Sequence, residues 1–479
     1  METGKNLIGG RWTAAAGGRT QDILSPFDGR TVGTVAVSEA RDATAALDAA
    51  ERGARTWRDT PAHERMDVML RAAQLMEERV ETVAQLLSGE NGKTITEARG
   101  EVGRAADMIR LAGFEGSQLY GDTLPLDANR GTGYDKLGFT VRQPVGVVVA
   151  ITPFNYPSLL VLHKIAPALA AGNAVVLKPA RTTPLTALAL AEVFVEAGLP
   201  EDVLSVVTGP GGELGDALVS DPRARKISFT GSTAVGEHIA SVAGVKRVSL
   251  ELGASCPVLI MADADLDAAA DAVAAGGFAN AGEVCISVQR VIVDPAIRGD
   301  FLDALLPKVR AIPFGDPSAA DSRLGTLISE QEAIRVETSL RTAVDSGAQL
   351  LTGGEREGAV ISPAVVDGVD PSTSLAQDEL FGPAVAVSEA TDFSAALAQA
   401  NDTQYGLAAG LFTGDVSRAV QAIRQIDAGM VHINWTPLWR ADLMPYGGMK
   451  ASGVGKEGFR TAVESMTEAK TVVLHGRPW

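Results

Sequence analysis

Cys285 is the residue in this chain whose type and setting most directly suggest chemistry. It lies in the segment 276–287, where a glycine-rich approach precedes the thiol and a run rich in β-branched residues, from Ile286 to Val293, follows it. This pattern predicts a turn that presents sulfur in a pocket, followed by a β-rich stretch. A thiolate is a strong nucleophile, but an isolated cysteine is more often a small buried apolar residue. Its role therefore depends on partner groups elsewhere in the chain.

Two glycine-containing loops could bind phosphate groups. Phe229-Thr230-Gly231-Ser232 follows a predicted strand and opens a predicted helix, and Gly209, Gly211 and Gly212 follow the preceding strand. A helix N-terminus offers free N–H groups and the positive end of a dipole to a pyrophosphate. Ligands of open α/β sheets bind at this edge of the sheet. Ordinary β-α turns have the same composition, so both explanations stay open at this point.

The chain also contains one literal GxGxxG pattern, at residues 453–458. No hydrophobic strand leads into it, and no acidic residue follows about 20 positions later within a βαβ unit. We therefore predict a backbone turn here, and not a dinucleotide fingerprint.

The overall composition excludes several classes of function. The chain has 479 residues and a formal net charge of −17, which argues against a nucleic-acid partner. Two cysteines cannot form a disulfide framework, so a reducing cytoplasm is expected. The longest apolar runs are too short to cross a membrane, and the first residues lack a signal-peptide pattern. Five scattered histidines predict no metal site.

The elements that must position Cys285 follow from the hydrophobic pattern. Helical spacing dominates residues 38–87 and 97–118, and residues 119–143 predict a hairpin that leaves the domain. From Val145 onward short apolar strands alternate with helices, which predicts a parallel, helix-covered sheet. A second α/β series runs from Asp267 to Ile433, and residues 470–474 predict a short, exposed strand.

Seven segments of the chain together resemble the aldehyde dehydrogenase superfamily, in the family's order and over nearly the whole length. The spacing of 34 residues between Glu251 and Cys285 is the family's own, and the GxGxxG pattern falls inside the last family motif. The segments are Thr152-Pro153-Phe154-Asn155-Tyr156-Pro157, Leu177-Lys178-Pro179-Ala180, Phe229-Thr230-Gly231-Ser232-Thr233, Leu250-Glu251-Leu252-Gly253, Gly282-Glu283-Val284-Cys285, Glu379-Leu380-Phe381-Gly382-Pro383, and the run from Pro445 to Gly453.

The resemblance implies an α/β fold in three parts. A Rossmann-like cofactor-binding domain would take residues 1–118 and 141–252, and an α/β catalytic domain would take residues 253–445. The segments 119–140 and 446–479 would form a small β oligomerisation arm. Because exposed edge strands invite pairing with another chain, we expect a homodimer or homotetramer.

The resemblance also implies oxidation of an aldehyde to a carboxylic acid with NAD or NADP. Cys285 would attack the aldehyde, and the Asn155 side-chain amide with the Cys285 N–H would bind the resulting oxyanion. Glu251 would activate the water that hydrolyses the thioester. Without the resemblance, Asn155 could be a turn residue and Glu251 a strand-end carboxylate. Lys178 is predicted to be catalytic together with Cys285, Asn155 and Glu251.

The family pattern places the cofactor as well. Lys178 would reach the adenosine ribose or its phosphate, Glu379 would hold the nicotinamide ribose, and Phe381 would pack beside the ring. The remaining predicted cofactor residues are Thr152, Pro153, Phe154, Ala180, Arg181, Gly211, Phe229, Thr230, Gly231, Ser232 and Leu252.

Arg181 departs from the family pattern, because NAD-preferring members commonly have a glutamate at this position. A guanidinium can pair with the 2′-phosphate of NADP. It can equally point to solvent, so the choice between NAD and NADP stays open.

The loop 434–444 would line the substrate mouth. Its Arg440-x-Asp442 element resembles the subgroup that includes phosphonoacetaldehyde, sulfoacetaldehyde, lactaldehyde and glyceraldehyde-3-phosphate dehydrogenases. Arg440 could steer an anionic aldehyde, or it could pair with Asp442 and only shape the loop. Trp435 and Trp439 could equally favour an aromatic or aliphatic aldehyde, so the substrate stays open.

Two other functions are alternatives to hydrolytic oxidation. In a CoA-acylating relative CoA would accept the acyl group, but such members generally lack the base that Glu251 supplies. A non-catalytic relative is disfavoured because Cys285, Asn155, Glu251 and Lys178 are all retained. Two neighbours of the thiol are predicted to be inactive: Cys256 as a buried spacer, and Glu283 as a side chain that faces away from the sulfur.

Overall fold

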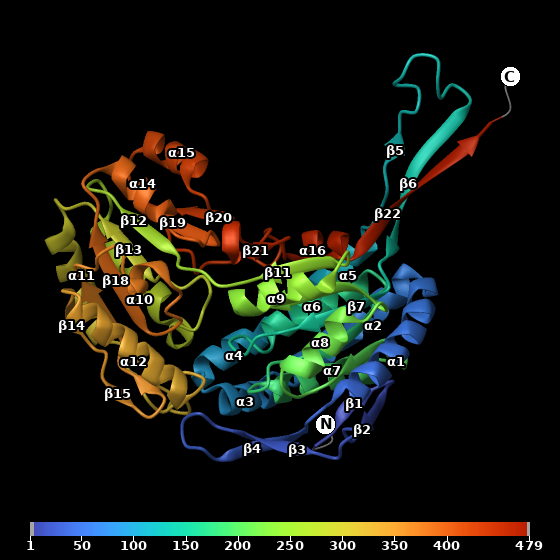
Figure 1. The fold of residues 1–479 in the computed structure, drawn as a ribbon, viewed down its shortest axis with the longest axis horizontal. Helices are drawn as coiled ribbons and strands as arrows, with labels where there is room; N and C mark the ends of the chain where they lie inside the picture. The colour runs from blue at the N-terminus through green and yellow to red at the C-terminus, as the bar shows by residue number, and fades with distance from the viewer. Residues whose placement is uncertain (1–3, 477–479) are drawn as a thin grey trace.

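Two large β-sheets and a projecting three-stranded arm organise the computed structural model, which describes residues 4–476 (Figure 1). The first sheet and its helices form the larger lobe, the second sheet forms the other lobe, and the arm leaves the larger lobe on the side away from the second sheet.

The first sheet has the order β2-β1-β9-β8-β7-β10-β11-β21. Its central strands are parallel, and β7 and β8 are buried along their whole length, as expected for a sheet with helices on both faces. The strands are β1 (Asn6–Ile8), β2 (Arg11–Thr13), β9 (Leu204–Val206), β8 (Ala174–Lys178), β7 (Val147–Ile151), β10 (Ala224–Thr230), β11 (Arg247–Glu251) and β21 (Gly453–Val454).

The helices around the first sheet follow the predicted spacing, with one difference. The predicted helix over residues 97–118 is interrupted at Arg104, next to Gly103, a residue with low helix propensity. The helices are α1 (Ala40–Asp59), α2 (Ala62–Glu78), α3 (Val80–Asn91), α4 (Ile95–Gly103), α5 (Ala105–Ser117), α6 (Leu159–Ala170), α7 (Pro184–Glu196), α8 (Gly212–Ser220) and α9 (Thr233–Ala243). The hairpin β3 (Thr20–Leu24) and β4 (Thr31–Ala36) lies below them in Figure 1.

The second sheet has the order β14-β17-β18-β13-β12-β19-β20, parallel except for β14. Its strands are β14 (Gln349–Thr352), β17 (Ala364–Asp367), β18 (Ala384–Glu389), β13 (Arg290–Val293), β12 (Pro257–Ile260), β19 (Ala408–Phe412) and β20 (Met430–Ile433). The helices are α10 (Leu266–Phe278), α11 (Arg298–Arg310), α12 (Glu330–Asp345), α13 (Ser374–Gln377), α14 (Phe393–Asn401) and α15 (Val416–Gln425), and a small hairpin joins β15 (Arg356–Glu357) to β16 (Val360–Ile361).

The β-rich stretch predicted from Ile286 to Val293 is shorter in the structure, where the strand begins only at Arg290. The N–H of Ser287 donates to the carbonyl of Val284 and its hydroxyl to the carbonyls of Gly276 and Gly277. These hydrogen bonds hold a turn after Cys285, so the strand cannot begin at Ile286.

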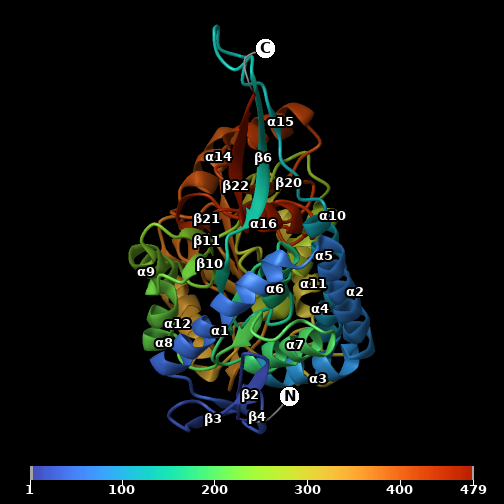
Figure 2. The ribbon, with the colours of Figure 1, turned by 90° about the vertical axis from the view of Figure 1, so that its right-hand side faces the viewer.

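The arm consists of β5 (Thr123–Leu124), β6 (Lys136–Pro144) and β22 (Thr467–His475). Figure 2 shows β6 and β22 side by side as they leave the body. The strand predicted at 470–474 is longer in the structure, because antiparallel pairing with β6 runs from Thr467↔Pro144 to His475↔Lys136.

The structure differs from the predicted arm segment 446–479. Gly453 and Val454 pair with β11 at the edge of the first sheet, and α16 (Phe459–Ser465) packs against α5 and α6. Phe459 and Val463 are buried in the core of the first lobe, which fixes this stretch there. Only from Thr467 does the chain join the arm. The end of the arm segment predicted at residue 140 also differs, because β6 continues to Pro144.

The described residues, 4–476, contain no helix with the length and apolar character needed to cross a membrane. No group of three or more His, Cys, Asp or Glu side chains in this range could hold a metal ion.

Candidate active site

Cys285 follows a strained loop that links α10 to β13. Asn280, Ala281 and Gly282 in the turn η1 (Ala279–Gly282) have φ angles of 48°, 52° and 73°. The left-handed conformation costs roughly 1–2 kcal/mol for a residue with a side chain. A Cβ at Gly282 would lie 2.0 Å from the carbonyl oxygen of Gly382, so only glycine fits there. The surrounding contacts must therefore hold this loop in place.

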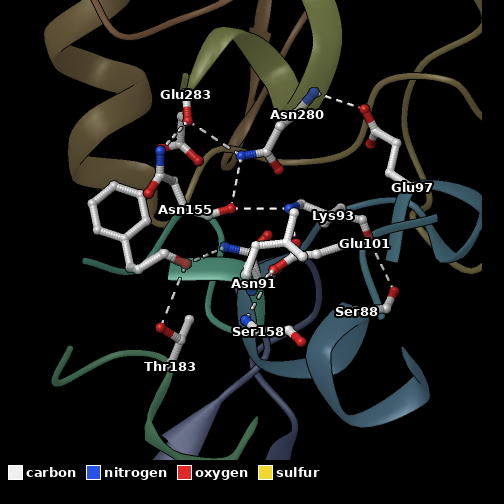
Figure 3. A network of polar contacts seen from close by, with 12 residues as sticks. Ser88, Asn91, Lys93, Glu97, Glu101, Asn155, Ser158, Thr183, Asn280 and Glu283 are labelled. Atoms are coloured by element: carbon white, nitrogen blue, oxygen red, sulfur yellow. Dashed lines mark hydrogen bonds and ion pairs between the residues drawn. The ribbon is translucent and has the colours of Figure 1, made fainter. Parts of the chain in front are cut away.

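Asn280 ties the loop to the segment that carries Asn155, as Figure 3 shows. Its backbone N–H donates to Glu97 over 2.7 Å. Its side-chain Nδ2 donates to the backbone carbonyl oxygens of Asn155 (3.1 Å) and Glu283 (3.3 Å). One amide side chain thus joins the two loops on which the predicted nucleophile and oxyanion donor lie.

A buried ion pair supports the same segment from α4 (Figure 3). Lys93 pairs with Glu101, and each side chain is 1% exposed. Lys93 Nζ also donates to the Asn155 carbonyl over 2.9 Å, while Glu101 accepts the N–H groups of Ser158 (2.9 Å) and Leu159 (3.1 Å). A carboxylate at the start of α6 complements the positive end of the helix dipole. Charged groups therefore fix the backbone from the Asn155 carbonyl to the start of α6.

Asn155 itself is 4% exposed and points to the loop before the sulfur. Its Nδ2 donates to the Glu283 carbonyl over 2.8 Å, which uses one of its two hydrogens. Its Oδ1 is buried and has no hydrogen-bond partner among residues 4–476. Within the same range the backbone N–H of Cys285 also donates no hydrogen bond. Both predicted oxyanion donors therefore retain hydrogen-bonding capacity.

The Cys285 side chain lines a cavity of about 100 Å³. Its Sγ lies 2.8 Å from the hydroxyl oxygen of Tyr446. Burial raises the pKa of the Cys285 thiol to about 12, while the Tyr446 hydrogen bond acts in the opposite direction. The residues that line the cavity are Arg104, Asn155, Tyr156, Leu159, Leu160, His163, Val284, Cys285, Ile286, Leu438, Arg440 and Tyr446.

Glu251 ends β11 and is 3% exposed. Neither of its carboxylate oxygens has a hydrogen-bond partner among the described residues. A Cβ at Gly447 would lie 2.6 Å from Glu251 Oε1, so the carboxylate lies against the segment that carries Tyr446. Burial, together with Glu457, raises the pKa of Glu251 well above its ordinary value. A buried carboxylate with a raised pKa is a stronger base than an exposed one, which suits it to accept a proton from water.

A second buried ion pair lies behind Glu251. Lys164 Nζ is 2.7 Å from Glu457 Oε1, and the two side chains are 0% and 4% exposed. Lys164 lowers the pKa of Glu251, whereas Glu457 raises it. Burial is the main influence on the pKa of Glu251, and the pair that joins α6 to the C-terminal segment adds two opposing contributions.

Thr152 and Lys178 lie together at the carboxyl edge of the first sheet, where the Thr152 N–H donates to the Lys178 carbonyl. Burial lowers the pKa of Lys178 to about 8, and its Nζ donates to the Pro179 carbonyl over 3.2 Å. Ala180 follows at the same edge, next to Arg181. The Arg181 Nε donates to Gln21 over 2.9 Å in an exposed position, so this guanidinium lies beside β3.

The next strand end carries the predicted phosphate loop. Phe229 and Thr230 end β10, the Gly231 N–H donates to the Glu251 carbonyl, and Ser232 precedes α9. A Cβ at Gly231 would lie 2.5 Å from the Phe229 ring. Gly211 precedes α8 and is exposed.

Five further predicted residues lie where the two lobes meet. Glu379 accepts the N–H of Ala254, close to Leu252, over 3.1 Å. Phe381 meets Phe154 edge to face, with ring centroids 5.9 Å apart, next to Pro153. The second lobe thus supplies Glu379 and Phe381 to the edge of the first sheet.

This edge has the free groups that a dinucleotide needs. The hydroxyl groups of Thr152 and Thr230 are buried without a partner among the described residues. The Ser232 side chain makes no capping hydrogen bond to α9, so the first N–H groups of this helix lack a side-chain acceptor. Free N–H groups at a helix start suit a pyrophosphate. The residues present therefore fit a nicotinamide dinucleotide.

Arg440 lines the Cys285 cavity, and its Nε is buried without a hydrogen-bond partner in the described range. The alternative pairing with Asp442 is not formed, because Asp442 binds Arg104 over 2.6 Å. Arg440 lies 3.8 Å from Glu457 instead. Trp435 and Trp439 are 48% and 56% exposed and do not line the cavity. The loop thus contributes Leu438 and Arg440 to the cavity wall.

Both neighbours of the thiol that are predicted to be inactive, Glu283 and Cys256, are buried. The Glu283 carboxylate accepts the Ile328 N–H over 3.1 Å, and burial raises its pKa to about 8. Cys256 is 2% exposed, its Sγ donates to the Cys285 carbonyl, and burial raises its pKa.

Several residues of this site were not singled out from the sequence: Tyr446, Lys164, Glu457, Arg104, Lys93 and Asn280. One signal was available for Lys164, a charged residue inside the otherwise apolar helix Leu159–Ala170. A charged side chain in such a helix must find a buried partner, which here is Glu457.

Known sequences and structures are similar to this chain over nearly its whole length. The model of the aldehyde dehydrogenase family matches residues 12–472. The chain is 41% identical to 3-sulfolactaldehyde dehydrogenase of Priestia megaterium, over 98% of this chain and 97% of the relative. It is 38% identical to an NADP⁺-dependent succinate-semialdehyde dehydrogenase of Escherichia coli, over 98% and 97%. The NADP complex of a glyceraldehyde-3-phosphate dehydrogenase from Bacillus halodurans matches with a TM-score of 0.97, 35% identity and full coverage of both chains.

Proposed function

This chain belongs to the aldehyde dehydrogenase family, and we propose that it oxidises its aldehyde through a covalent intermediate on Cys285. The predicted family, its subgroup and the α/β fold are confirmed, and the chain is an NAD(P)-dependent aldehyde dehydrogenase. The catalytic roles of individual residues are our proposal.

In the first step the Cys285 thiolate attacks the aldehyde carbon and forms a thiohemiacetal. The Asn155 amide and the Cys285 N–H bind the oxyanion, and both have unused hydrogen-bonding capacity. A nicotinamide held by the residues at the edge of the first sheet would supply the hydride acceptor. Collapse of the thiohemiacetal oxyanion expels the hydride and leaves a thioester on Cys285.

In the second step Glu251 takes a proton from water, which hydrolyses the thioester and releases the acid and the thiolate. The observation that carries this proposal is a buried carboxylate with both oxygens unpartnered among the described residues. A buried acceptor without a partner is costly, and an ordered substrate water would satisfy it. The same observation argues against the CoA-acylating alternative, which needs no base for water.

We further propose that the substrate is a small aldehyde that carries an anionic group. The cavity is lined by Arg104, Arg440 and His163 and by no aspartate or glutamate in the described range. Burial and the three nearby cations lower the pKa of His163, so this histidine is neutral and the arginines supply the charge. The names of the sulfolactaldehyde and succinate-semialdehyde relatives also specify aldehydes with an acidic group.

The test is an aldehyde panel with NAD and with NADP, with and without CoA. Succinate semialdehyde is compared with butanal, which has the same chain length and no charge. We expect reduction of cofactor and release of free acid without CoA, and a lower KM for the anion. Cys285→Ala should bind cofactor and form no product. Product formation by Cys285→Ala, or a strict need for CoA, would contradict the mechanism.

The substrate class has a separate control. Arg440→Gln should raise the KM for succinate semialdehyde and leave the KM for butanal nearly unchanged. An equal effect on both aldehydes would rule out an anion anchor at Arg440.

A further inference from the structure

We propose that Tyr446 is a catalytic residue whose hydroxyl group stabilises the Cys285 thiolate, and that Arg440 strengthens this hydrogen bond from above the Tyr446 ring. The inference rests on the proposed role of Cys285 as the nucleophile. In this proposal Arg440 acts on Tyr446 in the free enzyme, before any substrate binds.

The contact between the two side chains is short and protected from water. The Sγ-to-hydroxyl distance is 2.8 Å, and Tyr446 is 3% exposed. While Cys285 is a thiol, either group can donate the hydrogen bond. Once the thiol loses its proton, only the tyrosine can donate. Because a hydrogen bond to an ionised acceptor is stronger than one to a neutral group, deprotonation strengthens this contact.

The rest of the site disfavours the thiolate. Burial is the main cause, and the carboxylates of Glu379 and Glu251 also raise the pKa of Cys285. Tyr446 and Arg440 are the groups that lower it. The other ionisable neighbours on elements around the sulfur are Tyr156, Cys256, His163 and Arg104. A nucleophile in this setting needs a dedicated donor, and Tyr446 provides it.

Arg440 acts on the tyrosine ring. Its guanidinium carbon lies 3.9 Å from the centroid of the Tyr446 ring. A cation over an aromatic face draws electron density toward itself, so the hydroxyl becomes a stronger donor. Burial raises the pKa of Tyr446 well above its ordinary value, so the phenol keeps its proton. Tyr446 therefore donates a hydrogen bond and takes no proton, and the thiol proton leaves to solvent through the cavity.

The experiment measures the thiolate directly in the full-length, cofactor-free enzyme. The rate of Cys285 alkylation by iodoacetamide is followed against pH for the wild type and three variants. Tyr446→Phe removes the donor, and Arg440→Gln removes the cation. Tyr156→Phe is the matched control, because Tyr156 lines the same cavity and its ring contacts Lys93, 3.7 Å away.

We expect Tyr446→Phe to raise the apparent pKa of alkylation by about one unit or more, which lowers the thiolate fraction about tenfold below that pKa. Arg440→Gln should shift it in the same direction by less, and Tyr156→Phe should leave it unchanged. The pH profile of kcat/KM should move with the alkylation profile. An apparent pKa in Tyr446→Phe within about 0.3 unit of the wild type would overturn the proposal.

Two readouts separate this inference from the proposed function. If enzyme alkylated at Cys285, as located by mass spectrometry, still oxidises aldehyde, the nucleophile assignment fails. If alkylation inactivates the enzyme but the Tyr446→Phe profile is unchanged, only the role of Tyr446 fails. Circular dichroism and cofactor binding check folding. Should Tyr446→Phe not fold, Arg440→Gln decides, and an unshifted profile there overturns the proposal.

Discussion

The backbone carbonyl of Asn155 accepts a 3.1 Å hydrogen bond from the side-chain amide of Asn280, five residues before Cys285. The same oxygen accepts a 2.9 Å hydrogen bond from Lys93. The predicted oxyanion donor is thus held through its backbone by the loop that carries the nucleophile. This loop has strained φ angles at Asn280 and Ala281, so contacts must hold it in place. The hydrogen bond from Asn280 therefore positions both Asn155 and the loop that carries Cys285.

Asn280→Ala should lower kcat/KM by about tenfold, because loss of a buried hydrogen bond costs about 1–3 kcal/mol and releases the Asn155 segment. Asn155→Ala should be more severe, about 100-fold to 1,000-fold in kcat, since it removes a donor to the oxyanion. Steady-state kinetics measure both. The control is Asn129→Ala, an exposed residue in the loop of the arm. Full activity of Asn280→Ala would show that the bridge does not position Asn155.

Glu251→Gln should separate the two chemical steps. Reduction of the cofactor needs only Cys285 and the oxyanion donors, whereas hydrolysis needs the carboxylate. Rapid mixing should therefore show a burst of about one reduced cofactor per active site, followed by turnover about 10²–10⁴-fold slower than in the wild type. Loss of the burst, or turnover at the wild-type rate, would contradict the role of Glu251.

Arg181→Glu should lower kcat/KM for NADP by at least about tenfold relative to NAD, because a carboxylate repels the 2′-phosphate that a guanidinium can pair with. Arg181→Gln is the matched variant, which removes the charge without adding repulsion and should have an intermediate effect. Both cofactors are assayed with the same aldehyde. A wild-type enzyme with a strong preference for NAD would show that Arg181 does not bind the phosphate.

Glu283→Gln should alter how stability depends on pH. Burial raises the pKa of Glu283 to about 8 in the folded protein, so the folded state binds the proton more tightly than the unfolded state does. Its contribution to stability is complete below the unfolded pKa of about 4.3 and is lost as pH rises through about 8.

The Glu283→Gln variant carries a neutral side chain at every pH. Its free energy of unfolding should therefore fall less than that of the wild type as pH rises. Thermal unfolding between about pH 5 and about pH 9 should show a smaller fall in Tm for Glu283→Gln. Identical slopes for the two proteins would contradict this assignment.

We predict that this chain forms a homo-oligomer through the arm, so deletion of residues 467–479 should lower its mass in solution. The deletion removes β22 and leaves β6 paired only with the two-residue strand β5. Without β22 the arm lacks the edge strand whose free edge would pair with a partner chain. Light scattering measures the mass, with deletion of residues 477–479 as the control. An unchanged mass after the longer deletion would exclude the arm from assembly.

Much of the fold was predictable because it depends on local patterns. Apolar runs such as Val147–Ile151 and Ala174–Lys178 alternate with helical segments, and this alternation predicts a parallel sheet. The position of the chain around residues 446–466 was not predictable in this way. Val454 pairs with Leu250, about 200 residues earlier, and no local pattern records that contact.

The sequence by itself determined the identities and order of Cys285, Glu251 and Asn155, because each lies in a short motif whose spacing is written in the chain. Only the tertiary structure decided what surrounds them. Tyr446 reaches Cys285 across 161 residues, and Lys164 reaches Glu457 across 293 residues. Burial depends on such distant neighbours, and burial sets the pKa of each group. The residue types are therefore readable from the sequence, whereas their protonation and positioning are properties of the packed molecule.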